Sequence, residues 1–169
     1  MIWQGRFDGE DPLYHRIFQR VSLETDYTSI SPNDFVLHGF AVDEGVKRNK
    51  GRVGAKEAPD IIRKNMSNFP VISPEFSLKD FGNITCENGN LEGAQNELAE
   101  KVAEVLKKSG KSIVLGGGHE VTFAHYSGIR KAFPQSKIGI INIDAHFDNR
   151  EPEAGIGASS GTGFWQIAQ

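Results

Sequence analysis

Apolar residues gather in four short runs that are separated by polar or glycine-rich stretches. The run KIGIINI is almost uninterrupted, a pattern typical of a strand buried on both faces of a parallel sheet. The other runs are bounded by turn residues, which favours strands over helices. The sequence therefore predicts strands over residues 34–40, 77–84, 112–115 and 137–143.

Amphipathic stretches lie between these runs. After Pro59, the residues Ile62, Met66 and Phe69 recur at helical spacing and form one apolar stripe. The clearest helical pattern lies over residues 91–108. Its acidic residues come early and its lysines late, which suits the helix dipole, and Gly110 just after it is a typical helix stop. Helices are predicted over residues 60–69, 91–108 and 120–132, and another begins near the chain's last residues.

Strands that alternate with amphipathic helices predict an α/β fold in a single domain over residues 1–169. Residues 1–33 show no clear period and are expected to form an irregular lead-in with one short helix. Residues 42–56 are polar and rich in glycine, so we expect a loop that leaves the first predicted strand and forms the rim of a site.

Composition narrows the class of protein. The 169 residues are 38% apolar and 24% charged, with a formal net charge of −3 and no long run of one sign. This disfavours disorder and a nucleic-acid partner. No signal-peptide pattern and no apolar run of about 20 residues is present, so a cytoplasmic protein without a membrane partner is expected. Cys86 is the only cysteine, so any metal must be held by histidines and carboxylates.

Candidate metal ligands follow the last predicted strand. In extended chain, residues two apart point the same way, so Asp144, His146 and Asp148 of the segment DAHFD would converge. Oxygen and nitrogen ligands without thiolate suit Mn²⁺ or Zn²⁺, and the carboxylate-rich mixture favours Mn²⁺.

A further candidate ligand follows the run 112–115. There, three glycines allow a tight turn that delivers His119, with Glu120 beside it, at the start of a helix. Sites in open parallel sheets form beyond the carboxyl ends of strands, so His119 is expected to join the other ligands. A lone Asp at a strand end is more often a cap or turn residue, but the combination favours a metal site. The isolated residues are expected to be structural: Cys86, His15, His38 and His125.

These motifs resemble those of the ureohydrolases, the family of arginase, agmatinase and formimidoylglutamase. The resemblance lies in GGGHE at 116–120, NIDAHFD at 142–148, and GRVGA followed by APDIIR within 51–63. It extends from about residue 34 to the end of the chain. It implies an arginase-like three-layer α/β/α fold with a mostly parallel sheet, here truncated.

Three details are most similar to the formimidoylglutamases within this family. GGGHE stands where arginases usually have GGDHS, SSGTGF at 159–164 resembles SSGTPF, and Arg150 follows the last ligand. Arg150 would offer a bidentate, permanently charged partner for one of the two substrate carboxylates. Ser160 and Thr162 would hydrogen-bond the substrate or satisfy a turn. Gly163 and Trp165 depart from the family pattern, which weakens the substrate assignment.

The resemblance also implies a mechanism. A pair of Mn²⁺ ions would share a water and make it a hydroxide near neutral pH, and this hydroxide would attack the formimidoyl carbon of N-formimidoyl-L-glutamate. Glutamate and formamide would be released, as in histidine degradation. The first metal would take His119 and Asp148, the second His146, and Asp144 would bridge the two. A homo-oligomer is compatible with the resemblance.

The family's site is completed by a later Asp-x-Asp motif, and none follows Asp148 in this chain. We therefore expect the chain to be the amino-terminal part of a ureohydrolase domain, which by itself would be inactive. The alternatives are an agmatinase-type or arginase-type guanidino hydrolase, a deacetylase of the related superfamily, and a non-catalytic truncated homologue.

Overall fold

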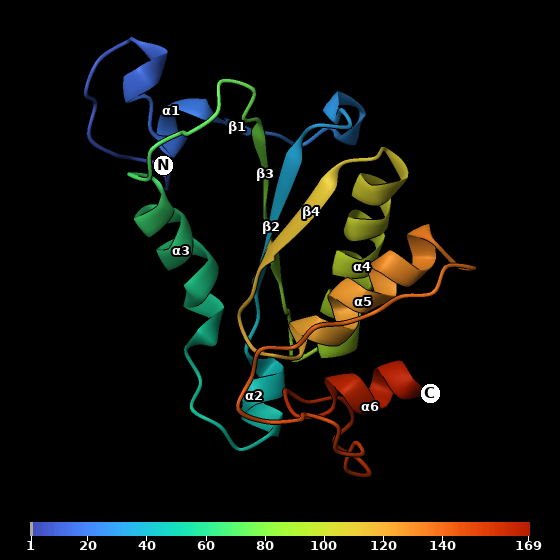
Figure 1. The fold of residues 1–169 in the computed structure, drawn as a ribbon. Helices are drawn as coiled ribbons and strands as arrows, with labels where there is room; N and C mark the ends of the chain where they lie inside the picture. The colour runs from blue at the N-terminus through green and yellow to red at the C-terminus, as the bar shows by residue number, and fades with distance from the viewer. Residues whose placement is uncertain (1) are drawn as a thin grey trace.

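The computed structural model describes residues 2–169 and contains one four-stranded parallel sheet. The strands follow the order β1 (Val21–Leu23), β3 (Leu78–Thr85), β2 (Phe35–Ala41) and β4 (Lys111–Leu115). In β2, Phe35 lies opposite Leu78 of one neighbour and Lys111 of the other. Figure 1 shows the strands side by side, with their carboxyl ends toward the short helix α2 (Glu44–Arg48).

Helices cover both faces of the sheet. Helix α3 (Ala58–Met66) lies on one face, while α4 (Leu91–Lys107) and α5 (Val121–Ala132) lie on the other (Figure 1). Helix α3 joins β2 to β3 and α4 joins β3 to β4, as parallel pairing requires, and α5 follows β4. The predicted three-layer α/β/α fold is confirmed.

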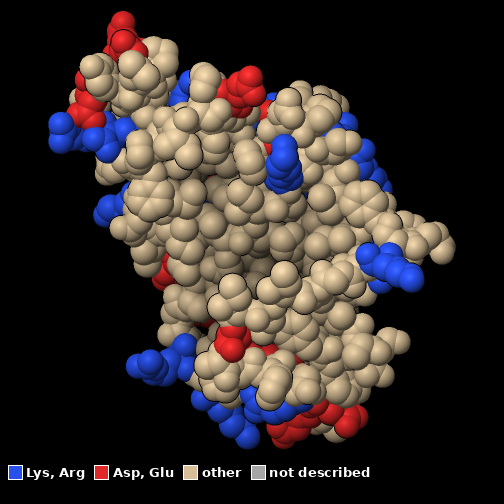
Figure 2. Space-filling view, viewed as in Figure 1, with Lys and Arg blue, Asp and Glu red and all other residues tan. Residues whose placement is uncertain are grey.

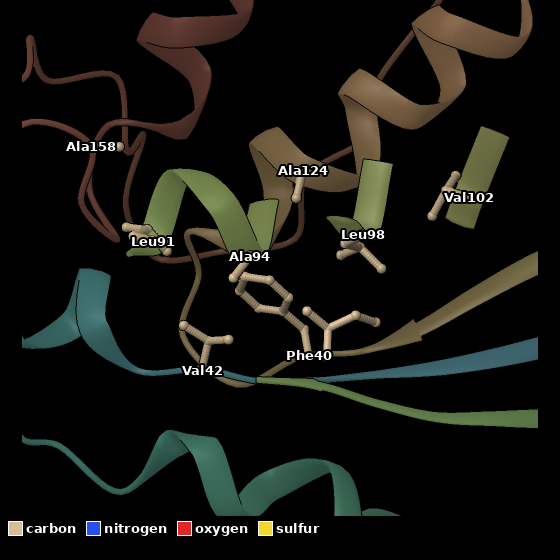
Figure 3. Packing of buried hydrophobic residues seen from close by; sticks show 9 residues of the cluster. Phe40, Val42, Leu91, Ala94, Leu98, Val102, Ala124 and Ala158 are labelled. Carbon is tan, nitrogen blue, oxygen red and sulfur yellow. The ribbon is translucent and has the colours of Figure 1, made fainter. Parts of the chain in front are cut away.

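The main core lies between the sheet and α4. Phe40, Leu91 and Leu98 are fully buried there (Figure 3), and each such side chain contributes about 1.5–3 kcal/mol relative to exposure. Helix α5 packs closely on α4 because Gly128 has no side chain: a Cβ at this position would lie 2.6 Å from Val102 Cβ. This close packing fixes the start of α5, where His119 is placed.

A buried ion pair fixes α3 to the opposite face. Arg63 Nε and Nη2 donate to the two carboxylate oxygens of Asp80, each at 2.8 Å, and the side chains are 1% and 4% exposed. Trp3 Nε1 donates to the same carboxylate at 2.7 Å. Because removing one partner of such a pair costs about 3–5 kcal/mol, these contacts hold the lead-in and α3 on the sheet.

Most predicted elements are confirmed to within a few residues. The strands over 34–40, 77–84 and 112–115 and the three predicted helices all form, and α6 (Gly163–Ala168) is the helix expected at the end. Within residues 2–33 the expected short helix is α1 (Ile17–Arg20), but β1 was missed because three residues are too few to show a period. The lead-in also contains two short 3₁₀ helices, Pro12–Tyr14 and Tyr27–Ser29.

The strand predicted over residues 137–143 is wrong. No strand pairing forms there within residues 2–169, and Ile141 and Ile143 are 93% and 96% exposed. A strand needs a neighbour for its backbone N–H and C=O groups, and this segment runs along α5 away from the outer edge of β4 (Figure 1). A hollow of about 340 Å³ separates it from Val114 and α5, and Figure 2 shows few charges on this face.

The loop predicted over residues 42–56 is only partly correct, because it contains a helix. Helix α2 (Glu44–Arg48) directly follows β2, and a 3₁₀ turn, Ala55–Glu57, precedes α3. The polar and glycine-rich sequence showed no helical pattern, because α2 is only about one turn long.

Within the described residues, no helix is both long and apolar enough to cross a membrane.

Candidate metal centre

His119 is delivered by the glycine turn after β4. Close approach of two backbones explains the glycines: a Cβ on Gly117 would lie 2.1 Å from the carbonyl oxygen of Val42, and the Gly118 N–H donates to that oxygen at 2.8 Å. The turn therefore holds the end of β4 against the end of β2. His119 follows directly, with a half-buried side chain that is 29% exposed.

Asp144 and Asp148 reach His119 from an irregular segment instead of a strand end. Asp144 Oδ1 accepts a hydrogen bond from the backbone N–H of His146 at 2.9 Å. Asp148 has φ +45°, in the left-handed region that Asp tolerates better than most residues, and its carbonyl accepts from the Phe164 N–H at 3.1 Å. The backbone at Asp148 is thereby tied to the start of α6.

Three of the four predicted ligands come together. Single ligand atoms of His119, Asp144 and Asp148 all lie within 4.8 Å of one another. His119 Nδ1 hydrogen-bonds Asp148 Oδ2 and lies 3.5 Å from Asp144 Oδ2. His146 is outside this group: its side chain is 81% exposed, with Nδ1 3.7 Å from Asp144 Oδ1. Its role as a ligand stays a prediction.

The electrostatics of the cluster favour an ionised carboxylate at Asp144. The hydrogen bond from the His146 amide lowers the pKa of Asp144 below its usual range, and the nearby imidazoles of His119 and His146 act in the same direction. An ionised carboxylate is the form that binds a cation.

The donor set fits a divalent metal. It consists of one imidazole nitrogen and carboxylate oxygens from two side chains, the mixture that suits Mn²⁺ or Zn²⁺ and leans toward Mn²⁺. His119, Asp144 and Asp148 would hold the ion, each through an atom that already faces the other two.

The predicted substrate residues lie on the loop beside this cluster. The backbone N–H of Arg150 donates to the carbonyl of Gly161 at 3.1 Å, so Arg150 is paired with residues 158–162, here called the serine-rich loop. Ser160 Oγ accepts a hydrogen bond, at 3.0 Å, from the side chain of Asn49. Thr162 is buried, and its hydroxyl donates to the Ser159 carbonyl and accepts from the Ser159 N–H, which favours a turn role.

Two residues acquire a role that sequence reasoning did not give them. Asn49, at the end of α2, contacts both Arg150 and Ser160. Glu120 is fully buried and accepts from the Gly45 N–H at 2.8 Å, so it joins the turn that carries His119 to α2. The sequence offered one signal for these roles: α2 lies within residues 42–56, which were predicted to form the rim of a site.

Comparison with known proteins shows the family of this chain. The model of the arginase family matches residues 33–169. Formimidoylglutamase of Vibrio vulnificus is 47% identical over 98% of this chain, and that of Staphylococcus carnosus is 41% identical over 99%. The chain covers 52% and 54% of these two proteins, so it spans about half the length of the curated relatives it matches.

Solved structures show the same likeness. Trypanosoma cruzi formiminoglutamase, whose structure was determined with Mn²⁺, superposes with a TM-score of 0.74 at 35% identity, over 80% of this chain and 48% of that one. Formimidoylglutamase from Bacillus subtilis superposes with a TM-score of 0.78 over 96% of this chain and 50% of that one, at 20% identity, and shows the likeness of fold. Because the arginase family model matches most of this chain, residues 33–169, the chain belongs to the arginase family.

Proposed function

We propose that the chain supplies half of a manganese-dependent site that hydrolyses N-formimidoyl-L-glutamate to L-glutamate and formamide. The observation that carries the proposal is the cluster of His119, Asp144 and Asp148, with Arg150 two residues beyond it. The relatives at 41–47% identity that bear the name formimidoylglutamase support this substrate over others of the family.

The chemistry divides between metal and protein. Bound Mn²⁺ would supply a hydroxide nucleophile near neutral pH by lowering the pKa of a water. Hydrolysis would join an oxygen atom from water to the formimidoyl carbon and would break the bond from that carbon to the glutamate nitrogen, which would gain a proton. Formamide and glutamate are the products, and the atoms balance with one water consumed.

The chain's own residues bind and orient the substrate. Arg150 offers a planar fork of donors to one substrate carboxylate, and the Ser160 hydroxyl lies within the same hydrogen-bonded group. Thr162 is excluded from direct contact in this proposal because its hydroxyl is already used within the turn. Asp144, Asp148 and His119 hold the metal, and we propose that His146 turns in to complete its ligands.

The wider roles follow from the same substrate. We propose that the protein acts in histidine degradation, in the cytoplasm, as part of a longer polypeptide or assembly that supplies the remaining ligands. Self-association into a homo-oligomer stays a prediction.

The test is a substrate comparison. The Mn²⁺-loaded product of the complete gene would be offered formimidoylglutamate, arginine and agmatine, with release of the amine product measured for each. Turnover of formimidoylglutamate alone is expected, with KM raised in Arg150→Gln and unchanged in Arg6→Gln, an exposed arginine of the lead-in. Turnover of arginine or agmatine would place the protein with the guanidino hydrolases, and no turnover would favour a non-catalytic homologue.

A further inference from the structure

The side-chain amide of Asn49 uses both of its ends. Asn49 Oδ1 accepts a hydrogen bond from Arg150 Nη2 at 2.9 Å, and Nδ2 donates to Ser160 Oγ at 3.0 Å. Only one orientation of the amide satisfies this pair, because a guanidinium is a donor and cannot face the NH₂ group. Asn49 therefore bridges the two residues proposed to bind the substrate.

Arg150 is held without being neutralised. Its backbone N–H is fixed by the Gly161 carbonyl, and its guanidinium lies against Gly161, where a Cβ would be 2.3 Å from Nη2. Within residues 2–169, Asn49 is the one side chain that hydrogen-bonds this guanidinium, and no carboxylate forms an ion pair with it. A neutral amide thus orients the fork and leaves its positive charge for a ligand.

The frame that carries Asn49 is shared with the metal site. Asn49 ends α2, and Gly45 of the same helix is clamped from two sides: its N–H donates to Glu120 Oε1 at 2.8 Å, and its carbonyl accepts from the Ser160 N–H at 3.1 Å. A Cβ at position 45 would lie 2.5 Å from the Glu120 carboxyl carbon, so only glycine fits there. Glu120 follows His119 directly, so one rigid group positions both metal ligand and Asn49.

A second contact fixes α2 at its other side. Arg48 Nη1 donates to the Ala158 carbonyl at 3.1 Å and to Glu92 at 2.7 Å, which ties the helix to the serine-rich loop and to the start of α4. Helix α2 is therefore fixed to both the serine-rich loop and α4, and this fixes the position of the Asn49 amide that hydrogen-bonds Arg150.

We propose that Asn49 is a positioning residue for a carboxylate-bearing substrate, because its neutral amide aims the Arg150 fork while preserving the charge that binds the carboxylate. This inference rests on the proposed function and adds a specificity determinant to it. It requires the amide specifically. A carboxylate at position 49 would keep the acceptor but would pair with Arg150 and compete with the substrate.

The test uses the Mn²⁺-loaded product of the complete gene with Asn49→Asp and Asn49→Ala. For formimidoylglutamate, KM should rise about tenfold or more in Asn49→Asp while kcat stays within about twofold, since the new charge acts on binding of the carboxylate. Asn49→Ala should raise KM less, because Arg150 loses its orientation but keeps its charge. For an N-alkylformamidine without carboxylates, kcat/KM should be alike in all three proteins.

Asn65→Asp, the same change on the exposed side of α3, is the matched control and should leave KM unchanged. Equal KM values for formimidoylglutamate in the unsubstituted protein and Asn49→Asp would overturn the inference, as would an equal loss with the amidine that lacks carboxylates. If the unsubstituted protein turns over no formimidoylglutamate, the proposed function fails separately. Calorimetric binding of glutamate then decides on Asn49, because an unchanged Kd in Asn49→Asp contradicts its role.

Discussion

His119 Nδ1 and Asp148 Oδ2 share a hydrogen bond, although the two residues are 29 positions apart. Such a bond between an imidazole nitrogen and a carboxylate oxygen requires one proton between them. Both atoms are proposed metal-binding atoms, so this proton occupies the place that a cation would take. Asp144 Oδ2, 3.5 Å from the same nitrogen, faces that place as well.

Mn²⁺ binding is therefore expected to break the hydrogen bond between His119 and Asp148, because both atoms would turn to the cation. His119→Gln, which removes the imidazole nitrogen, should weaken Mn²⁺ binding about tenfold or more. Isothermal titration of the complete gene product with Mn²⁺ would measure the Kd. The variant His15→Gln, changed in a histidine that contacts Glu10 in the lead-in, should keep the Kd of the unsubstituted protein. An unchanged Kd in His119→Gln would mean that this nitrogen is no ligand.

His38 makes the stability of the fold depend on pH. It is fully buried in β2, where Tyr27 Oη lies 2.7 Å from its Nε2. Burial lowers the pKa of His38 to about 4, and Lys101 acts in the same direction. As the pH falls below about 6.5, the unfolded chain takes up a proton that the folded chain refuses, so stability is lost between about pH 6.5 and pH 4 and is constant above.

The expected loss is about 1.4 kcal/mol per pH unit within that window, and at most about 3.5 kcal/mol in total. Urea unfolding at several pH values would measure it, and His38→Gln should flatten this part of the profile. His125, whose pKa is also lowered by burial, contributes a separate loss of the same sign, so His125→Gln serves as the comparison. A profile unchanged by His38→Gln would contradict the assignment.

The exposed isoleucines of residues 137–143 should make the 169-residue chain bind apolar dyes. Ile141 and Ile143 are almost fully exposed beside a hollow lined by β4 and α5. Replacing both with serine should lower the fluorescence of bound anilinonaphthalene sulfonate. Serine at Ile72, which is 95% exposed but lies between α3 and β3 and does not line this hollow, should change it little. Equal fluorescence in all variants would show that the segment is covered.

The sequence predicted the elements whose packing partners lie within residues 2–169. Leu98 and Val102 mark one face of α4, and they pack in one core with Phe40 of β2. The run 137–143 has an equally strong strand pattern, yet it pairs with no strand within residues 2–169, and pattern alone cannot show this. Intrinsic preference for a strand is overridden when the segment gains no hydrogen-bonded neighbour.

The candidate site was predicted in part for the same reason. His119, Asp144 and Asp148 were expected to meet, and their ligand atoms do. His146 was expected to join them because alternate residues of an extended strand point the same way. The segment is irregular instead of extended, so this alternation does not hold. Asn49 was missed because its importance comes from contacts with residues more than 100 positions away.

Anomalous diffraction at the manganese edge, from crystals of the Mn²⁺-soaked gene product, tests the central claim most directly. The account predicts manganese peaks within bonding distance of His119 Nδ1 and of carboxylate oxygens of Asp144 and Asp148. The peak next to Asp148 should vanish in Asp148→Asn and persist in Glu75→Gln, a surface carboxylate in a turn away from the cluster. No peak at these residues, or a peak that survives Asp148→Asn, would contradict the account.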